Sequence, residues 1–174
     1  MELRPEFLLP AISKTLKDVI LPALDETHQV AQEQLKLAIG FLDILASQRH
    51  LLFAFDLDEL ARHAEMARGL AGLLGKSADH AELLAEVGQI SGNGVADPDR
   101  IVAITRQLRQ VIVDLVEDGY ARGDATLAAD IRHRMNEYAR VQLARERAWV
   151  LSMGFENAPD AVPSIALQLG KAVA

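Results

Sequence analysis

The strongest constraint in this sequence is a long, almost continuously apolar segment at residues 28–55, which reads HQVAQEQLKLAIGFLDILASQRHLLFAF. At about 100° per residue, its apolar side chains cover an arc of roughly 220°, whereas the stripe of an ordinary surface helix is roughly 100° wide or somewhat more. The arc has Ala31, Leu35, Ala38, Leu42 and Leu45 in its middle and Ile39, Leu37, Phe41 and Ile44 on its flanks. The remaining polar line consists of Glu33, Lys36, Gly40, Asp43 and Ser47. We expect such a helix to be covered on two sides, by helices of the same chain or of a partner.

Helical periodicity continues along the rest of the chain, and no strand pattern competes with it. Apolar stripes predict further helices over residues 5–24, from 56 or 58 to 75, from 77 or 79 to 90, and over 98–119 and 124–153, with one last turn near 165–169. Pro10 predicts a late start or a kink of the first helix, and Pro22 predicts its break. Asp25, Asp97 and Asp124 have the positions of N-terminal caps. The sequence Ser-Gly-Asn-Gly at 91–94 predicts the clearest loop in the protein.

These elements predict an all-α fold, because every long segment carries the helical period. Short connections favour antiparallel neighbours, so we expect an up-and-down bundle of four or five main helices around the central hydrophobic helix. A length of 174 residues suits one domain with a sizeable core. We place that domain at residues 1–156 and expect residues 157–174 to form a C-terminal tail with at most a short helix.

Composition and charge exclude several classes of function. A net charge of -7 argues against nonspecific nucleic-acid binding, which needs a basic face. No uncharged apolar run reaches the roughly 20 residues of a membrane span, because Asp43 interrupts the best candidate. The absence of cysteine excludes disulfides, thiolate metal sites and a cysteine nucleophile. Together with the lack of a signal segment, this composition predicts a cytoplasmic protein.

Two carboxylate and histidine pairs invite a metal interpretation, because helical bundles can hold metals between facing Glu and Glu-x-x-His positions. They are Glu59 with His63 and Asp130 with His133. Helical projection places these side chains away from the apolar stripes, neither pair has the Glu-x-x-His spacing, and no second copy supplies further ligands. The sequence therefore predicts ordinary solvated residues here, with no metal and no cofactor.

The residues that follow His63 also argue against a phosphotransfer role for this histidine. His63 followed by Arg68 and Gly69 superficially resembles the histidine-phosphotransfer domain. That family has a lysine three residues after the histidine and a glycine next, where this chain has Met66 and Ala67. The group that would neutralise the phosphate is therefore missing. Nucleophile elbows, phosphate loops and dinucleotide fingerprints are also missing, so the sequence names no catalytic residue.

The last long helix contains the most informative irregularity, because polar residues continue its core line. The stripe begins with Leu127, Ile131, Met135 and Tyr138 and then reaches Gln142, Arg145, Glu146 and Trp149. Burying such polar groups requires partners. Either the helix end is solvated, or Trp149, Met153 and Phe155 meet a partner protein, or Gln142, Arg145 and Glu146 line a polar pocket. The candidate ligand or interface residues are thus Tyr138, Gln142, Arg145, Glu146, Trp149, Met153 and Phe155.

The N-terminal run RPEFLLPAISKTLKDVILPALD resembles the opening of small, uncharacterised all-helical proteins of bacteria. Those proteins share a pattern of leucines that ends in a Leu-Pro-Ala-Leu segment. Their genes often lie beside acyl-CoA dehydrogenases and aminoglycoside-phosphotransferase-like kinases. The resemblance implies an accessory role in acyl-CoA metabolism and assigns no functional residue.

Two functions from different classes remain open at this stage. The first is a noncatalytic helical interaction or accessory protein, a homodimer or the subunit of a partner, that works through apolar helix faces. The second is a ligand-binding or enzymatic bundle with a polar site near Arg145. The helix-forming composition, the missing catalytic motifs and the wide central stripe favour the first.

Overall fold

The computed structural model of the protein describes residues 4–93 and 97–170. These residues form helices, turns and bends, and none of them forms a strand, which confirms the all-α fold class. The chain divides into two compact units. The terminal unit comprises Met1–Leu52 and Ala144–Ala174, and the central unit comprises Phe53–Leu143.

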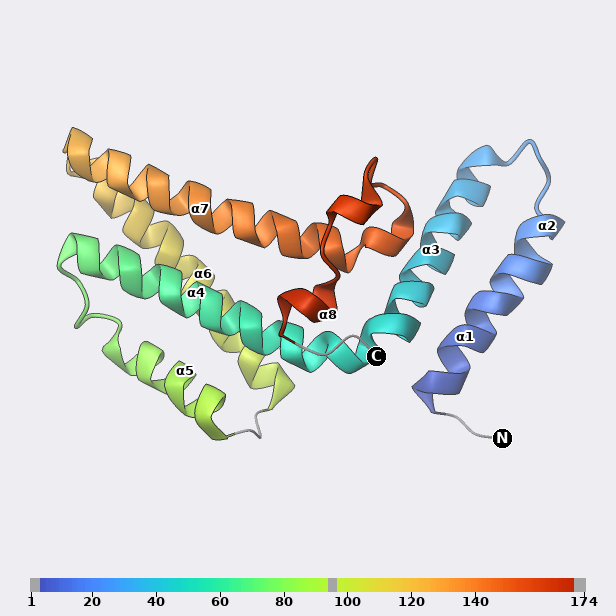
Figure 1. Cartoon of the computed structure of the whole chain (residues 1–174), viewed down its shortest axis with the longest axis horizontal. Helices are drawn as coiled ribbons and strands as arrows, with labels where there is room; N and C mark the ends of the chain where they lie inside the picture. Colours follow the sequence, from blue (N-terminus) through green and yellow to red (C-terminus); the bar gives the residue numbers. More distant parts are fainter. Residues whose placement is uncertain (1–3, 94–96, 171–174) are drawn as a thin grey trace. The chain divides into compact units, whose positions relative to one another are not determined.

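The N-terminal part of the terminal unit is a pair of antiparallel helical segments (Figure 1). The first segment is continuous and consists of α1 (Pro5–Thr15), the π-helix η1 (Leu16–Ile20) and α2 (Leu21–Ala23); the second is α3 (Gln29–Gln48), followed by the 3-10 turn η2 (Arg49–Leu51). The hydroxyl of Ser13 donates a hydrogen bond to Asp43, and Arg49 lies 3.6 Å from Glu6. These polar contacts hold α1 along α3.

Prolines shape the first segment differently from the prediction. The helix begins at Pro5 and runs through Pro10, so the predicted late start is wrong. The break after Pro22 is confirmed, because the helix ends at Ala23. The wider π turn at Leu16–Ile20 precedes Pro22, whose ring would otherwise clash with the carbonyl four residues earlier.

The first residue of α3 also differs from the prediction. Asp25 does not cap this helix but closes a local turn, accepting hydrogen bonds from the Thr27 amide at 2.8 Å and the Thr27 hydroxyl at 2.7 Å. These hydrogen bonds lower the pKa of the Asp25 carboxyl. The helix therefore starts at Gln29, with His28 as its N-cap.

The C-terminal part of the terminal unit follows the end of α7. It contains the 3-10 turns η3 (Leu151–Met153) and η4 (Pro159–Ala161) and the short helix α8 (Ile165–Gln168). Gly154 ends η3 with a φ of 75°, a left-handed conformation that favours glycine. In α8, Ile165 is buried and Ser164 accepts from the Leu167 amide as the N-cap. The tail thus holds one short helix.

The central unit contains four long helical segments. They are α4 (Leu52–Leu74, counted from Phe53), α5 (Ala81–Asn93), α6 (Pro98–Ala121) and α7 (Ala125–Trp149, as far as Leu143). Successive segments run in alternate directions (Figure 1). The guanidinium of Arg122 donates to the carbonyl of Leu74 at 3.1 Å, which places the C-terminal end of α4 at the turn between α6 and α7. As a result α4 and α7 are antiparallel.

The main apolar core lies in this central unit. Its buried members are Leu60, Ala64, Met66, Ala67, Leu70, Ala71, Leu74, Val87, Ile101, Ile104, Leu108, Ile112, Leu115 and Ile131. Each fully buried Leu or Ile contributes roughly 1.5–3 kcal/mol relative to an exposed one, so these side chains dominate the stability of the unit. The predicted stripes of α4 and α6 are confirmed, including Asp97 as the N-cap of α6.

The predicted central helix is covered differently from the expectation. None of the core cluster comes from α3, in which only Ile39 and Ile44 are buried. In the middle of its apolar arc, Ala31, Ala38 and Leu45 are exposed, with Leu45 at 42%, and Leu35 and Leu42 are half-buried. The reason is that α1 and η3 contact residues of the polar line: Ser13 bonds to Asp43, and the side chain of Met153 lies against Gly40.

The predicted loop at 91–94 is wrong for its first residues. The backbone of α5 remains helical through Asn93, and Gly94 lies outside the described residues. One glycine in a helix interior costs only about 1 kcal/mol relative to alanine, which the apolar face of α5 offsets by packing Val87 into the core.

A close approach of α6 and α7 predicts the effect of Gly119→Ala. A Cβ atom at Gly119 would lie 2.2 Å from the Cδ1 atom of the buried Ile131 and 3.4 Å from Leu74. We expect this variant to lose about 1–3 kcal/mol of unfolding free energy through overpacking, despite the higher helix propensity of alanine. Urea denaturation followed by circular dichroism measures this change.

The matched control is Gly72→Ala in α4, where a Cβ atom meets nothing within 4 Å. That variant should gain about 0.5–1 kcal/mol, because the helix interior favours alanine over glycine. Equal effects of the two substitutions would contradict the close contact of α6 with α7.

Candidate functional site

The residues predicted along the last helix separate into the two units. Tyr138 and Gln142 are half-buried and belong to the central unit, where both line a groove between α4 and α7. Arg145 belongs to the terminal unit and is only 1% exposed, while Glu146 is exposed. A solvated helix end is therefore wrong for Arg145.

The three predicted partner-facing residues lie in the terminal unit. Trp149 is half-buried, and its carbonyl accepts a hydrogen bond from Gln48 of α3 at 3.0 Å. Met153 is half-buried and lies against Gly40, so that a Cβ atom there would be 2.5 Å from its sulfur. Phe155 remains 67% exposed. Trp149 and Met153 thus contact the chain's own α3, and Phe155 offers a free apolar surface.

A groove of about 600 Å³ lies between α4 and α7 in the central unit. Its lining residues are Arg62, Glu65, Met66, Leu73, Asp130, His133, Arg134, Glu137, Tyr138, Val141 and Gln142. The first four come from α4 and the others from α7. Small-molecule sites typically range from about 300 to 1,000 Å³, and this groove falls within that range. Most of its lining residues are charged or polar, with Met66, Leu73 and Val141 as the apolar ones.

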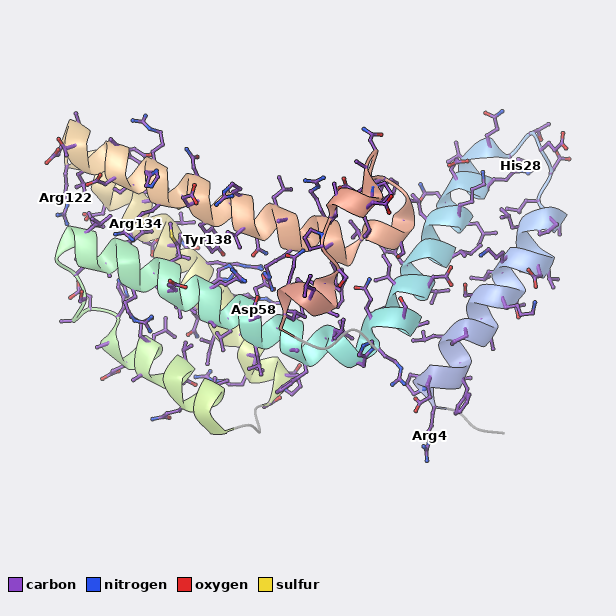
Figure 2. All side chains as sticks on the ribbon, viewed as in Figure 1. Arg4, His28, Asp58, Arg122, Arg134 and Tyr138 are labelled. Atoms are coloured by element: carbon purple, nitrogen blue, oxygen red, sulfur yellow. The ribbon has the colours of Figure 1, made fainter. Side chains whose placement is uncertain are left out.

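Arg134 lies across this groove against the backbone of α4. A Cβ atom at Gly69 would be only 3.1 Å from the Nη1 atom of Arg134. Glycine is unfavourable inside a helix, so its presence at this position has a packing reason: it makes room for the guanidinium. Figure 2 labels Arg134 and Tyr138 on α7, on the side that faces α4.

The charged side chains of the groove differ in whether they already have partners. Arg62 donates to Asp58 at 2.7 Å, and Glu137 accepts from Arg140 at 2.8 Å, which lowers the pKa of Glu137. In contrast, three groove residues make no hydrogen bond or ion pair with any residue that the structure describes: Glu65, Asp130 and Arg134. These three groups are available to a ligand.

Beside the groove, His63 is the centre of a polar network that connects α4 with α6. Its Nδ1 atom lies 2.8 Å from the carbonyl of Glu59, and its Nε2 atom accepts from the Nε of Arg109 at 3.2 Å. The Arg109 guanidinium also donates to the Glu59 carboxylate. Because Nε2 accepts, the ring is neutral and Nδ1–H is the donor to Glu59.

The predicted solvation of His63 is therefore wrong, since this side chain is only 5% exposed. Projection on α4 alone could not show the two residues that cover it. Arg109 comes from α6, and Tyr138 of α7 meets the imidazole edge to face, with ring centroids 5.6 Å apart. Tyr138 thus joins this network to the groove.

A second, smaller hollow of about 150 Å³ lies near the network. Asp56, Glu59, Thr105, Arg106 and Arg109 line it together with apolar side chains. Burial raises the pKa of Asp56, and the nearby charge of Glu59 raises it further. An ionised Asp56 therefore destabilises the folded chain. In the described parts of the chain, no three His, Asp or Glu side chains gather as a metal would require.

No family model, curated protein or solved structure matches the chain. The function is therefore inferred from the geometry of this chain alone.

Length and composition also mark one stretch for its apolar character. Within the described residues, the continuous helical stretch Gln29–Leu74 is the one that is long and apolar enough to cross a membrane. Core helices of water-soluble proteins have the same length and composition, but they are mostly buried. Here only 17% of the most apolar window is buried. The stretch thus carries apolar surface that the described chain leaves exposed.

The sequence alone names Asp130 as a possible metal ligand and gives no reason to group it with Arg134. Asp130, Arg134 and Tyr138 share one stripe of α7 at four-residue spacing, and Arg134 lies against Gly69 of α4. A glycine inside a strongly helical segment was the available signal. It could not be interpreted without knowing which helix packs opposite it.

The raised pKa of Asp56 predicts that Asp56→Asn stabilises the protein at pH 7. For a carboxyl whose pKa is higher in the folded state, stability falls as the pH rises from the unfolded pKa, near 4, through the folded pKa. The neutral amide of the variant removes this pH-dependent loss of stability. Thermal melts between pH 3 and pH 7 should show a higher Tm for the variant at pH 7 and equal values near pH 3. A lower Tm at pH 7 would contradict the assigned cause.

Proposed function

We propose that this chain is a noncatalytic helical interaction protein that pairs with a second copy of itself through α3. The observation that carries the proposal is an exposed stripe without a charged residue: Val30, Ala31, Gln34, Ala38, Phe41 and Leu45. Val30 is 77% and Phe41 55% exposed. Contiguous apolar surface of this kind marks interaction sites in soluble proteins.

The spacing of the stripe favours another helix as its partner. Residues 31, 34, 38, 41 and 45 alternate steps of three and four, the pattern along which two helices pack with their side chains interdigitated. The stripe from residue 30 to 45 extends over about 22 Å along the axis. An antiparallel pair of such helices is thus long enough to cover the apolar positions of both.

Self-complementarity favours a second copy rather than an unrelated protein. In a two-fold symmetric pair, each position meets its counterpart across the axis. The small Ala38 and the large Phe41 lie near the middle of the stripe, so Phe41 of each copy would pack over Ala38 of the other. The exposed Phe155 lines a hollow with Leu37 of α3 and would extend this surface.

The cellular location and the pathway that we propose rest on the sequence. An acidic, cysteine-free chain supports a cytoplasmic location with neither nucleic acid nor membrane as the partner. The resemblance of residues 4–25 to small helical proteins of bacteria supports an accessory role in acyl-CoA metabolism. An up-and-down bundle around the core of α4, α6 and α7 would be the scaffold that carries the interaction helix.

A second function, binding of a small ligand, is favoured by one observation. Tyr138 and Gln142, two of the polar-line residues of α7, line the groove against α4 together with charged groups that have no partner. This ligand-binding function is compatible with self-association, because the groove and the α3 stripe share no residue.

Self-association predicts that Phe41→Glu produces a monomer. A charge in the middle of the stripe would have to be buried without a partner, which strongly opposes pairing. Size-exclusion chromatography with light scattering should give twice the chain mass for the wild type at micromolar concentration and the single chain mass for the variant.

The matched control is Val113→Glu, which replaces a 48% exposed residue of α6 outside the stripe. This variant should remain dimeric. A monomeric wild type, or dissociation of both variants, would overturn the proposal. A monomer that sediments with phospholipid vesicles would overturn it as well and assign the stripe to a membrane surface.

A further inference from the structure

We propose that the groove between α4 and α7 binds a zwitterionic amphiphile, a molecule with a phosphate, an ammonium group and an apolar tail. The proposal deepens the ligand-binding function above and does not depend on self-association. It rests on two charged groups of the groove, Arg134 and Asp130, that pair with no described residue, and on the apolar lining residues Met66, Leu73 and Val141 of the central unit.

The antiparallel register of α4 and α7 determines the order of these charges along the groove. Gly69 lies beside Arg134, and His63 contacts Tyr138 one turn further along α7. By the same register Glu65 is close to the level of Tyr138, and Asp130 is close to that of Leu73. Arg134 is thus in the middle, with a carboxylate about 6 Å away along the axis in each direction.

Arg134 is the group that would bind the phosphate. Its guanidinium lies against α4 at Gly69, and no carboxylate of the described chain neutralises it. The planar fork of an arginine matches a phosphate through two parallel hydrogen bonds, so this contact would be both strong and directional. Arg62 already pairs with Asp58, which makes it the weaker candidate.

Asp130 is the group that would bind the ammonium. It precedes Arg134 by four residues on α7, so both side chains lie on one face of the helix, and it has no partner among the described residues. Both side chains are exposed at the groove, so a ligand with one charge only would engage either Arg134 or Asp130 and leave the other in water. A ligand with both charges satisfies them together.

The tail would extend from Arg134 in the opposite direction. There Met66 of α4 and Tyr138 and Val141 of α7 line the groove, and the side chain of Glu65 is exposed to solvent at the level of Tyr138. Tyr138 is held in place by its ring contact with the buried His63, so this floor is preorganised. From Arg62 to Leu73 the groove measures about 16 Å along α4, which suits a headgroup with a medium-length alkyl chain.

Three probes with the same octyl tail test the headgroup preference. They are octyl phosphoethanolamine, octyl phosphate and octylamine, each used below its micelle concentration, with calorimetric titration as the readout. The phosphoethanolamine should bind about tenfold tighter than either singly charged probe, because it alone compensates both charges. Phosphoethanolamine without a tail should bind more weakly than the octyl form.

Substitutions of Arg134 and Asp130 test separately which side chain binds the phosphate and which binds the ammonium group. Arg134→Gln should weaken binding of both phosphate probes about tenfold and leave octylamine unchanged. Asp130→Asn should weaken binding of phosphoethanolamine and octylamine and leave octyl phosphate at least as tight. Arg132→Gln, an exposed position of α7 outside the groove, is the matched control and should change none of them.

The variant Gly69→Ala distinguishes an effect on ligand binding from an effect on protein stability. The added Cβ atom displaces the flexible guanidinium but improves the helix, so this variant should melt at a higher temperature and bind octyl phosphoethanolamine more weakly. Failure of all three probes to bind, equal affinity for them, or unchanged binding by the Arg134 variant would overturn the proposal. Phe41→Glu should retain binding, which distinguishes failure of this site from failure of self-association.

Discussion

The interaction on which the central unit depends is the packing of the apolar face of α4 against α6 and α7. Leu60, Leu70 and Ile104 are completely buried in this contact, and Gly119 lets the side chain of Ile131 fill the space between α6 and α7. Interiors of this kind are close-packed, so the helices have one register relative to one another. That register buries His63 of α4 and places Arg62 and Glu65 of the same helix at the groove.

One consequence of the register is that the charges of the central unit differ in their role. Arg109 and Glu59 satisfy each other and the buried His63, which orients Tyr138. Arg134, one turn away on α7, crosses the same groove without a carboxylate partner among the described residues. A protein that needed Arg134 only for stability could pair it as it pairs Arg62 and Arg140. The proposed ligand site therefore depends on a charge that this packing leaves without a partner among the described residues.

In the terminal unit, contacts along the polar line of α3 decide which side of that helix is covered. Asp43 bonds to Ser13 of α1, and Gly40 accommodates the side chain of Met153. Both contacts use the narrow polar line of the helix. The stripe of Val30, Ala31, Gln34, Ala38, Phe41 and Leu45 consequently remains on the surface. The proposal of self-association rests on that exposure rather than on the width of the arc.

The sequence by itself determined the helices, because their signals are local. The all-α class, the cap of α6 at Asp97 and the stripes of α4 and α6 follow from side-chain periodicity and proline or glycine placement. It could not determine how helices far apart in sequence meet. His63 seemed solvated because its cover comes from α6 and α7, and the helix with the widest apolar arc seemed central although the main core contains none of it. Only the tertiary structure decided the neighbours of each helix face, since periodicity specifies which residues share a face and packing specifies what covers it.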